Sequence, residues 1–92
     1  MGNVKYSKIQ TSNGIITFTE DKKTYYKEFD SYEYLRVYSM TNRFKIYINN
    51  SKDYIYLRSG EELILEDFSI NSLKIETDTE VGVSSLMYYV CK

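Results

Sequence analysis

The chain has 92 residues and a formal net charge of −1, with no histidine, no proline and one cysteine, Cys91. This length suits one domain, residues 1–92, because two independent hydrophobic cores would need a longer chain. A single cysteine cannot form a disulfide within the chain. The lack of histidine excludes a Ser-His-Asp triad, a Cys-His pair and the usual zinc sites.

Charge is distributed unevenly along the chain. Residues 1–58 carry a formal charge of +4 and residues 59–92 carry −5. This asymmetry favours pairing of the two halves across one sheet, and the alternative is head-to-tail contact between subunits. The pI of about 5.4 and the absence of a long basic run lead us to expect no nucleic-acid partner.

No segment of the sequence indicates a membrane or secretory address. The first residues are polar and alternating, without the apolar stretch of a signal peptide. No run approaches the roughly 18 apolar residues of a transmembrane helix. We therefore expect neither a signal peptide nor a transmembrane segment, and no membrane partner.

Alternation of apolar and polar residues runs through nearly the whole chain. It predicts strands over residues 4–9, 15–20, 24–29, 35–40, 44–49, 54–57, 63–66, 73–76 and 81–90. Turns are predicted at Ser12-Asn13-Gly14, at Glu20 to Lys23, at Asp30-Ser31, over 49–53, at Gly60 and at Asn71-Ser72. Residues 30–36 are the best helical candidate, limited to about one turn by their tyrosine content. About eight or nine short strands predict an all-β fold, a single small antiparallel β-sandwich of jelly-roll type.

Three segments make the most specific structural predictions. In residues 44–49, Phe44, Ile46 and Ile48 are expected to face the core. Phe68 and Ile70 are expected to fill a corner of the fold. The last segment has no charge from Val81 through Cys91, so we expect this strand to be central in a sheet or covered by a partner.

The remaining chemistry-bearing residues form no recognisable site. Carboxylate pairs occur at Glu61-Glu62, Glu66-Asp67 and Asp78/Glu80, but none has the spacing of a calcium-binding loop. The glycines are scattered, so the chain lacks a phosphate-binding loop. We therefore predict no catalytic, metal-binding or cofactor-binding residues, no cofactor, and a protein that is not an enzyme.

Eleven tyrosines and no tryptophan make tyrosine the most unusual feature of the composition. Alternation places five of them opposite the apolar side of their strands, and these form the candidate contact face: Tyr34, Tyr38, Tyr47, Tyr54 and Tyr56. Such a face could contact another protein or stack against a sugar. The alternative is that tyrosine serves only as a good strand former with its hydroxyl in water.

Residues 44–49, 54–63 and 66–75 resemble small β-sandwich virion accessory proteins of tailed phages, such as head decoration, head fibre or other capsid-associated proteins. The shared pattern is a strand, a Gly60-Glu61 turn, a strand, a Phe-x-Ile corner at 68–70 and a further strand. Ser59 stands where many such proteins have proline. The resemblance covers part of the chain. It implies an accessory structural role in oligomeric form, in the virion or the host cytoplasm, with no catalytic residues to carry over.

The sequence therefore favours a non-catalytic structural or binding module. The leading hypothesis is a phage or phage-like virion accessory protein that self-associates, as a homo-oligomer, or docks on a larger assembly. One alternative is a carbohydrate-binding module that uses surface tyrosines. The other is a small inhibitor protein that binds a host protein.

Overall fold

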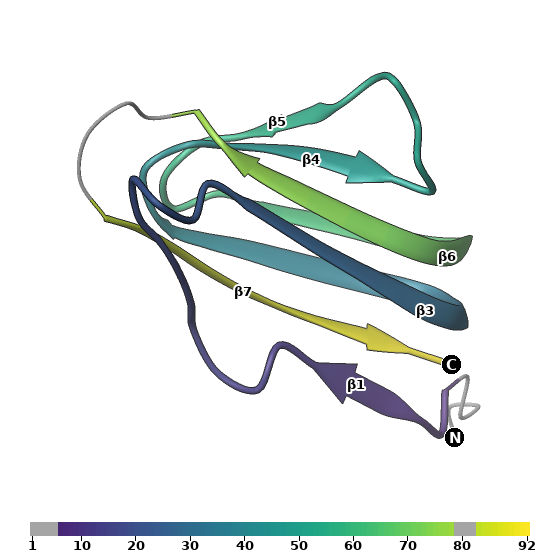
Figure 1. The fold of residues 1–92 in the computed structure, drawn as a ribbon. Coiled ribbons are helices and arrows are strands. Elements are labelled where there is room, and N and C mark those ends of the chain that lie inside the picture. The colour runs from purple at the N-terminus through teal and green to yellow at the C-terminus, as the bar shows by residue number, and fades with distance from the viewer. Residues whose placement is uncertain (1–5, 79–82) are drawn as a thin grey trace.

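The computed structural model describes residues 6–78 and 83–92, and this part of the chain contains seven strands and no helix. The strands are β1 (Ile9–Thr11), β2 (Ile16–Phe18), β3 (Thr24–Thr41), β4 (Phe44–Ile48), β5 (Ile55–Leu57), β6 (Glu62–Thr77) and β7 (Ser84–Cys91). All their pairings are antiparallel, in the order β1-β7-β3-β6-β4-β5, with β2 also paired to β7. The predicted all-β antiparallel fold is confirmed (Figure 1). No helix in the described residues is long and apolar enough to cross a membrane.

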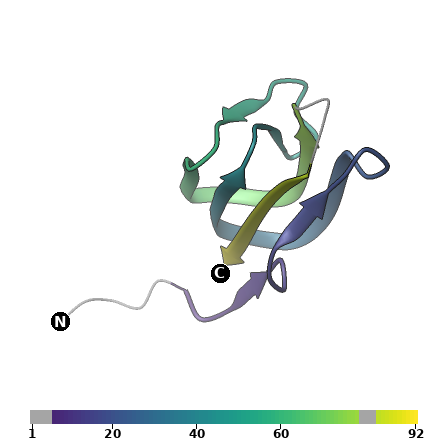
Figure 2. The same cartoon turned by 90° about the vertical axis from the view of Figure 1, so that its left-hand side faces the viewer.

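The two longest strands, β3 and β6, pair with each other and bend together. Their pairing runs from Thr24 opposite Glu76 to Tyr38 opposite Glu62, and its register shifts between positions 28 and 34. Ser31 has a φ of 49° and Asp67 a φ of 53°, so each strand leaves the regular pleat near its middle. Such bulges bend a strand and increase its twist. The β3–β6 pair therefore curves from one layer of the fold into the other (Figure 2).

These bends divide the fold into two layers. The first layer contains β1, β2, β7, the second half of β3 and the first half of β6. The second layer contains the first half of β3, the second half of β6, β4 and β5. The core lies between the layers and consists of Ile16, Phe18, Tyr32, Leu35, Val37, Phe44, Ile46, Ile48, Leu57, Ile70, Leu73, Ile75, Leu86, Tyr88 and Val90.

Aromatic contacts join the two layers directly. Phe18 of the first layer packs edge-on against Phe44 of the second, with 5.3 Å between ring centroids. The hydroxyl groups of Tyr25 and Tyr88 form a 2.7 Å hydrogen bond across the same space. Burial of Phe44, Ile46 and Ile48 confirms the inward side predicted for their strand.

Two predicted breaks are wrong. The predicted turns at Asp30-Ser31 and Asn71-Ser72 lie inside β3 and β6, so four predicted short strands become two long ones. Residues 30–36, the helical candidate, are likewise part of β3. The bulges accommodate the turn-forming residues without ending the strands. The described residues consequently contain seven strands, fewer than the eight or nine expected.

The corner predicted at Phe68 and Ile70 is half correct. Ile70 is fully buried, but Phe68 is 47% exposed. Both residues lie beyond the irregularity at Asp67, where the alternation of the first half of β6 no longer applies.

The N-terminal strands flank the predicted turn but do not form a hairpin. The turn at Ser12-Asn13-Gly14 is confirmed, with φ values of 57° at Asn13 and 99° at Gly14. However, β1 and β2 do not pair with each other. Each of them pairs antiparallel with β7 instead. β7 thus lies between them and β3, so the structure shows the first of the two predicted alternatives, a last strand that is central in a sheet. Residues 81 and 82 of that prediction lie outside the described residues.

Candidate protein-binding face

The outer side of the first layer gathers side chains from β1, β3, β6 and β7. In β7, Leu86, Tyr88 and Val90 are buried, so Met87 and Tyr89 point outward. Arg36 lies opposite both Tyr89 and Ile64, and Tyr38 lies opposite both Met87 and Glu62. We call this surface the outer aromatic face, and it consists of Ile9, Tyr34, Arg36, Tyr38, Glu62, Ile64, Met87 and Tyr89.

Several large apolar side chains on this face are exposed, and Tyr38 lies directly opposite Met87. Ile9 is 62% exposed, Ile64 43%, and Tyr38 and Met87 39% each. The rings of Tyr34 and Tyr89 stack nearly parallel, at 14° and 5.9 Å between centroids. Burial and hydrogen bonding to Tyr89 raise the pKa of the Tyr34 hydroxyl. Exposed apolar side chains beside stacked aromatic rings are typical of an interaction site.

An ion pair compensates the charge at the centre of the face. The Arg36 guanidinium donates to Glu62, with 2.8 Å between Nε and Oε2. Hydrogen bonding to Tyr89 and to Glu62 raises the pKa of Arg36, so it stays charged. Because both partners are partly exposed, we expect this pair to add little to stability. Its effect is to leave no net charge at the centre of the face.

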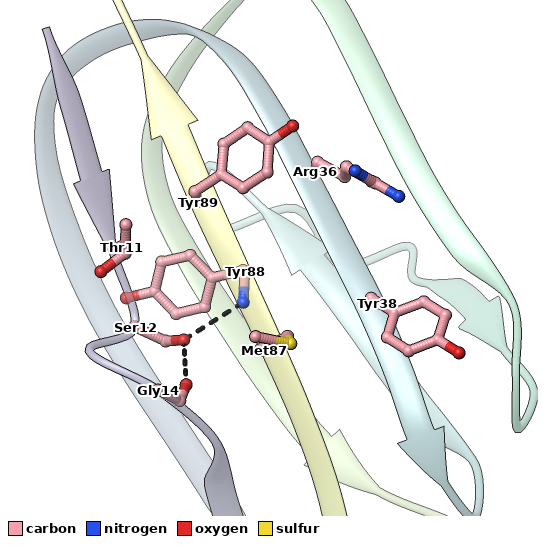
Figure 3. A pocket seen from close by; sticks show the side chains of 8 residues that line it. All are labelled: Thr11, Ser12, Gly14, Arg36, Tyr38, Met87, Tyr88 and Tyr89. Carbon is pink, nitrogen blue, oxygen red and sulfur yellow. Dashed lines mark hydrogen bonds between the residues drawn. The ribbon is translucent and has the colours of Figure 1, made fainter.

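A cavity of about 290 Å³ opens on the outer aromatic face (Figure 3). Its lining residues are Thr11, Ser12, Gly14, Arg36, Tyr38, Met87, Tyr88 and Tyr89. The turn between β1 and β2 forms one wall. Ser12 accepts a 3.3 Å hydrogen bond from the Tyr88 backbone N–H and donates one of 2.5 Å to the Gly14 carbonyl. Strand pairing with β7 stops at Thr11 and resumes at Ile16, and the space beside Met87 stays open between them.

The structure separates the five tyrosines of the predicted contact face into two groups. Tyr34 and Tyr38 lie on the outer aromatic face, whereas Tyr47, Tyr54 and Tyr56 lie on the outer side of the second layer. The five therefore do not form one continuous patch. Alternation correctly placed them outward, but it carries no information about which strands adjoin.

Charged groups surround the tyrosines of the second layer. Lys45 Nζ lies 5.0 Å from the ring centroid of Tyr54, and Lys74 Nζ lies 5.2 Å from that of Tyr47. Hydrogen bonding to Glu76 raises the pKa of Tyr47.

Tyr56 also contacts a charged group: its hydroxyl donates a 2.8 Å hydrogen bond to Asp78, and this bond raises the pKa of Tyr56. These rings are held by neighbours of their own chain.

Sequence reasoning missed six of the eight residues of the outer aromatic face: Ile9, Arg36, Glu62, Ile64, Met87 and Tyr89. The alternation of the last strand contained a signal for two of them, since Met87 and Tyr89 alternate with the apolar Leu86 and Val90. The adjacent Tyr88 obscured it, because a tyrosine suits either side of a strand.

The carboxylates do not assemble into a metal site in the described part of the chain. No three His, Cys, Asp or Glu side chains there are close enough to hold one ion. Glu61 and Glu62 are bound by arginines, and hydrogen bonds from Arg58 lower the pKa of Glu61. Glu80 lies outside the described residues. Burial raises the pKa of the Cys91 thiol, which makes it less reactive than an ordinary cysteine.

No protein-family model matches the sequence, and neither does any curated protein sequence. Solved structures nevertheless share the fold. A cupin-2 domain protein from Shewanella frigidimarina has a TM-score of 0.56 and 11% identity, covering 99% of this chain and 76% of that one. A protein of unknown function (DUF1255) from Acinetobacter has a TM-score of 0.57 and 14% identity, covering 83% and 66%. Drosophila melanogaster CENP-C, solved bound to CAL1, has a TM-score of 0.52 and 15% identity, covering 80% and 56%.

These similarities show that the chain folds as a small cupin-like jelly roll. It spans about two thirds of the Acinetobacter protein and 56% of the CENP-C chain. The structural neighbours are cupin-fold proteins and not phage virion proteins, so the resemblance to virion accessory proteins is wrong. Its basis, a Gly-Glu turn between two strands, suits jelly rolls in general.

Proposed function

We propose that this cupin-fold domain is a non-catalytic module that binds another protein through the outer aromatic face. The observation that carries the proposal is the exposure of Tyr38 and Met87 at a cavity, with Ile64 exposed on the neighbouring strand and the central charge compensated. Interface cores are enriched in tyrosine, methionine and arginine and depleted in uncompensated charge.

A structural neighbour supports this use of the fold. Drosophila melanogaster CENP-C contains a cupin domain, and one solved structure of CENP-C is of its complex with CAL1. A small inhibitor that binds a host protein would be one form of the same function.

The carbohydrate alternative would rely on the tyrosines of the second layer. A sugar needs an open ring face and free hydroxyl partners. Lys45 and Lys74 lie over two of these rings, and Asp78 holds the hydroxyl of Tyr56. These contacts favour protein binding by the first layer over sugar stacking on the second.

Site-specific photocrosslinking in the organism that encodes the chain tests the proposal. A photoreactive phenylalanine analogue would replace Tyr38 in one variant and Tyr56 in a matched control, since both residues are 39% exposed. We expect a defined covalent adduct with a protein, identified by mass spectrometry, from position 38 and none from position 56. Adducts from position 56 alone, or from neither position, would overturn the proposal.

A further inference from the structure

We infer that the protein bound by the outer aromatic face is a second copy of this chain, which docks by a two-fold axis running along β3. This inference rests on the proposed function and names the partner of that site. It is carried by the placement of an exposed apolar side chain and a cavity on opposite sides of one strand.

The face is complementary to itself. β3 lies between β6 and β7, and Arg36 on β3 is opposite Ile64 on one side and Tyr89 on the other. Ile64 is exposed, while Tyr89 and Met87 line the cavity. A two-fold rotation about an axis parallel to β3 leaves each residue at the same position along the strand direction. It exchanges the β6 side of the face with the β7 side. Ile64 of each copy then meets the cavity of the other, as an isologous interface requires.

The charges on this face permit the approach of an identical copy. Arg36 is neutralised by Glu62 within its own chain. Among the first-layer positions that share the outward side with Arg36 (34 to 40 of β3, 62 to 66 of β6 and 85 to 91 of β7), the other charged residue besides Glu62 is Glu66, which lies opposite Tyr34 toward the end of the face. The exposed Glu33 and Asp67 lie beyond it, at the bend. Because the charge at the centre of the face is neutralised, two identical faces do not repel each other there. A strongly charged partner would find no opposite charge there to bind.

The size of the face requires that nearly all of it be used. β7 has 8 residues, and four adjacent strands at about 4.8 Å spacing and 3.3 Å rise form a surface of roughly 25 by 20 Å. That is about 500 Å² before side-chain relief is counted, whereas a stable interface buries about 800 Å² of accessible surface per partner. Both margins, Ile64 on β6 and Ile9 on β1, are therefore expected to be covered.

Sedimentation velocity of the purified chain over a dilution series tests the inference. We expect a reversible dimer whose dissociation constant rises at least about tenfold on Tyr38→Asp or Ile64→Asp. Tyr56→Asp, a change of the same size and exposure on the second layer, should leave it unchanged. Circular dichroism would confirm that each variant is folded. A wild-type chain that stays monomeric, or a dimer equally weakened by Tyr56→Asp, would overturn the inference.

Cysteine crosslinking tests the arrangement independently. In a Cys91→Ser background, Ile64→Cys and Tyr89→Cys lie at one level on opposite sides of Arg36, so the two-fold axis brings position 64 of one copy opposite position 89 of the other. Identical cysteines are displaced from each other by a further two strand spacings, about 10 Å. Because facing sheets pack about 10 Å apart, beyond the roughly 7 Å Cα separation of a disulfide, the crosslinker is a short bismaleimide. A mixture of the two single variants should form a covalent dimer faster than either variant alone. Absence of that preference would overturn the two-fold axis along β3.

The outcomes separate this inference from the proposed function. A monomeric chain whose position 38 crosslinks to a different protein would keep the protein-binding function and reject the second copy as partner. A monomeric chain without any crosslink would reject both.

Discussion

Replacement of Phe44 by alanine is expected to lower the free energy of unfolding by about 3–5 kcal/mol. Phe44 is fully buried and packs against Phe18 across the two layers. Its strand also holds the second layer together, because Phe44 pairs with Leu57 of β5 on one side and Thr77 of β6 on the other. Since small domains have a stability of about 5–15 kcal/mol, this loss should leave a substantial unfolded fraction at moderate temperature.

Chemical denaturation followed by circular dichroism measures this effect. Ile15→Ala is the control, because Ile15 is 54% exposed and its truncation should change stability by less than about 0.5 kcal/mol. If Phe44→Ala costs no more than the control, β2 and β4 do not pack face to face, and the two-layer arrangement is wrong.

Replacement of Tyr88 by phenylalanine should cost about 1–3 kcal/mol near neutral pH, because it leaves the partly buried Tyr25 hydroxyl without its partner. This difference between the two proteins should shrink in alkali. Burial and the hydrogen bond with Tyr25 raise the pKa of Tyr88 above its ordinary value of about 10. The folded state thus retains the proton longer than the unfolded state, so stability is full below about pH 10 and falls above it.

Urea denaturation of both proteins between neutral pH and pH 11 tests this account. Wild-type stability should fall by up to about 1.4 kcal/mol per pH unit from Tyr88 above pH 10, and the variant should lack that contribution. Tyr34, Tyr47 and Tyr56 also have raised pKa values, so the variant should keep a shallower decline. Parallel pH profiles for the two proteins would show that Tyr88 is not buried against Tyr25.

The sequence predicted strands best where alternation was uninterrupted. Phe44, Ile46 and Ile48 alternate with polar or amphipathic residues, and all three are buried. The central position of β7 was one of the two alternatives that its lack of charge indicated. The long bent strands could not be predicted, because Ser31 and Asp67 have left-handed backbone conformations that such residues usually adopt in turns.

The candidate site was harder to predict than the fold. The outward direction of Tyr34 and Tyr38 follows from local alternation, but their contact with Tyr89 and Met87 depends on β7 pairing with β3. That pairing joins segments nearly fifty residues apart, and no local pattern encodes it. The cavity likewise depends on β1 and β2 sharing one partner strand in place of forming a hairpin.

Two-dimensional NMR of the isotopically labelled chain over a dilution series tests most directly whether the outer aromatic face is the binding surface. Amide and methyl resonances of Arg36, Tyr38, Ile64, Met87 and Tyr89 should shift with concentration, while those of the second-layer tyrosines stay constant. Shifts that gather instead on Tyr47, Tyr54 and Tyr56 would contradict the assignment of the binding surface, and a spectrum independent of concentration would contradict self-association.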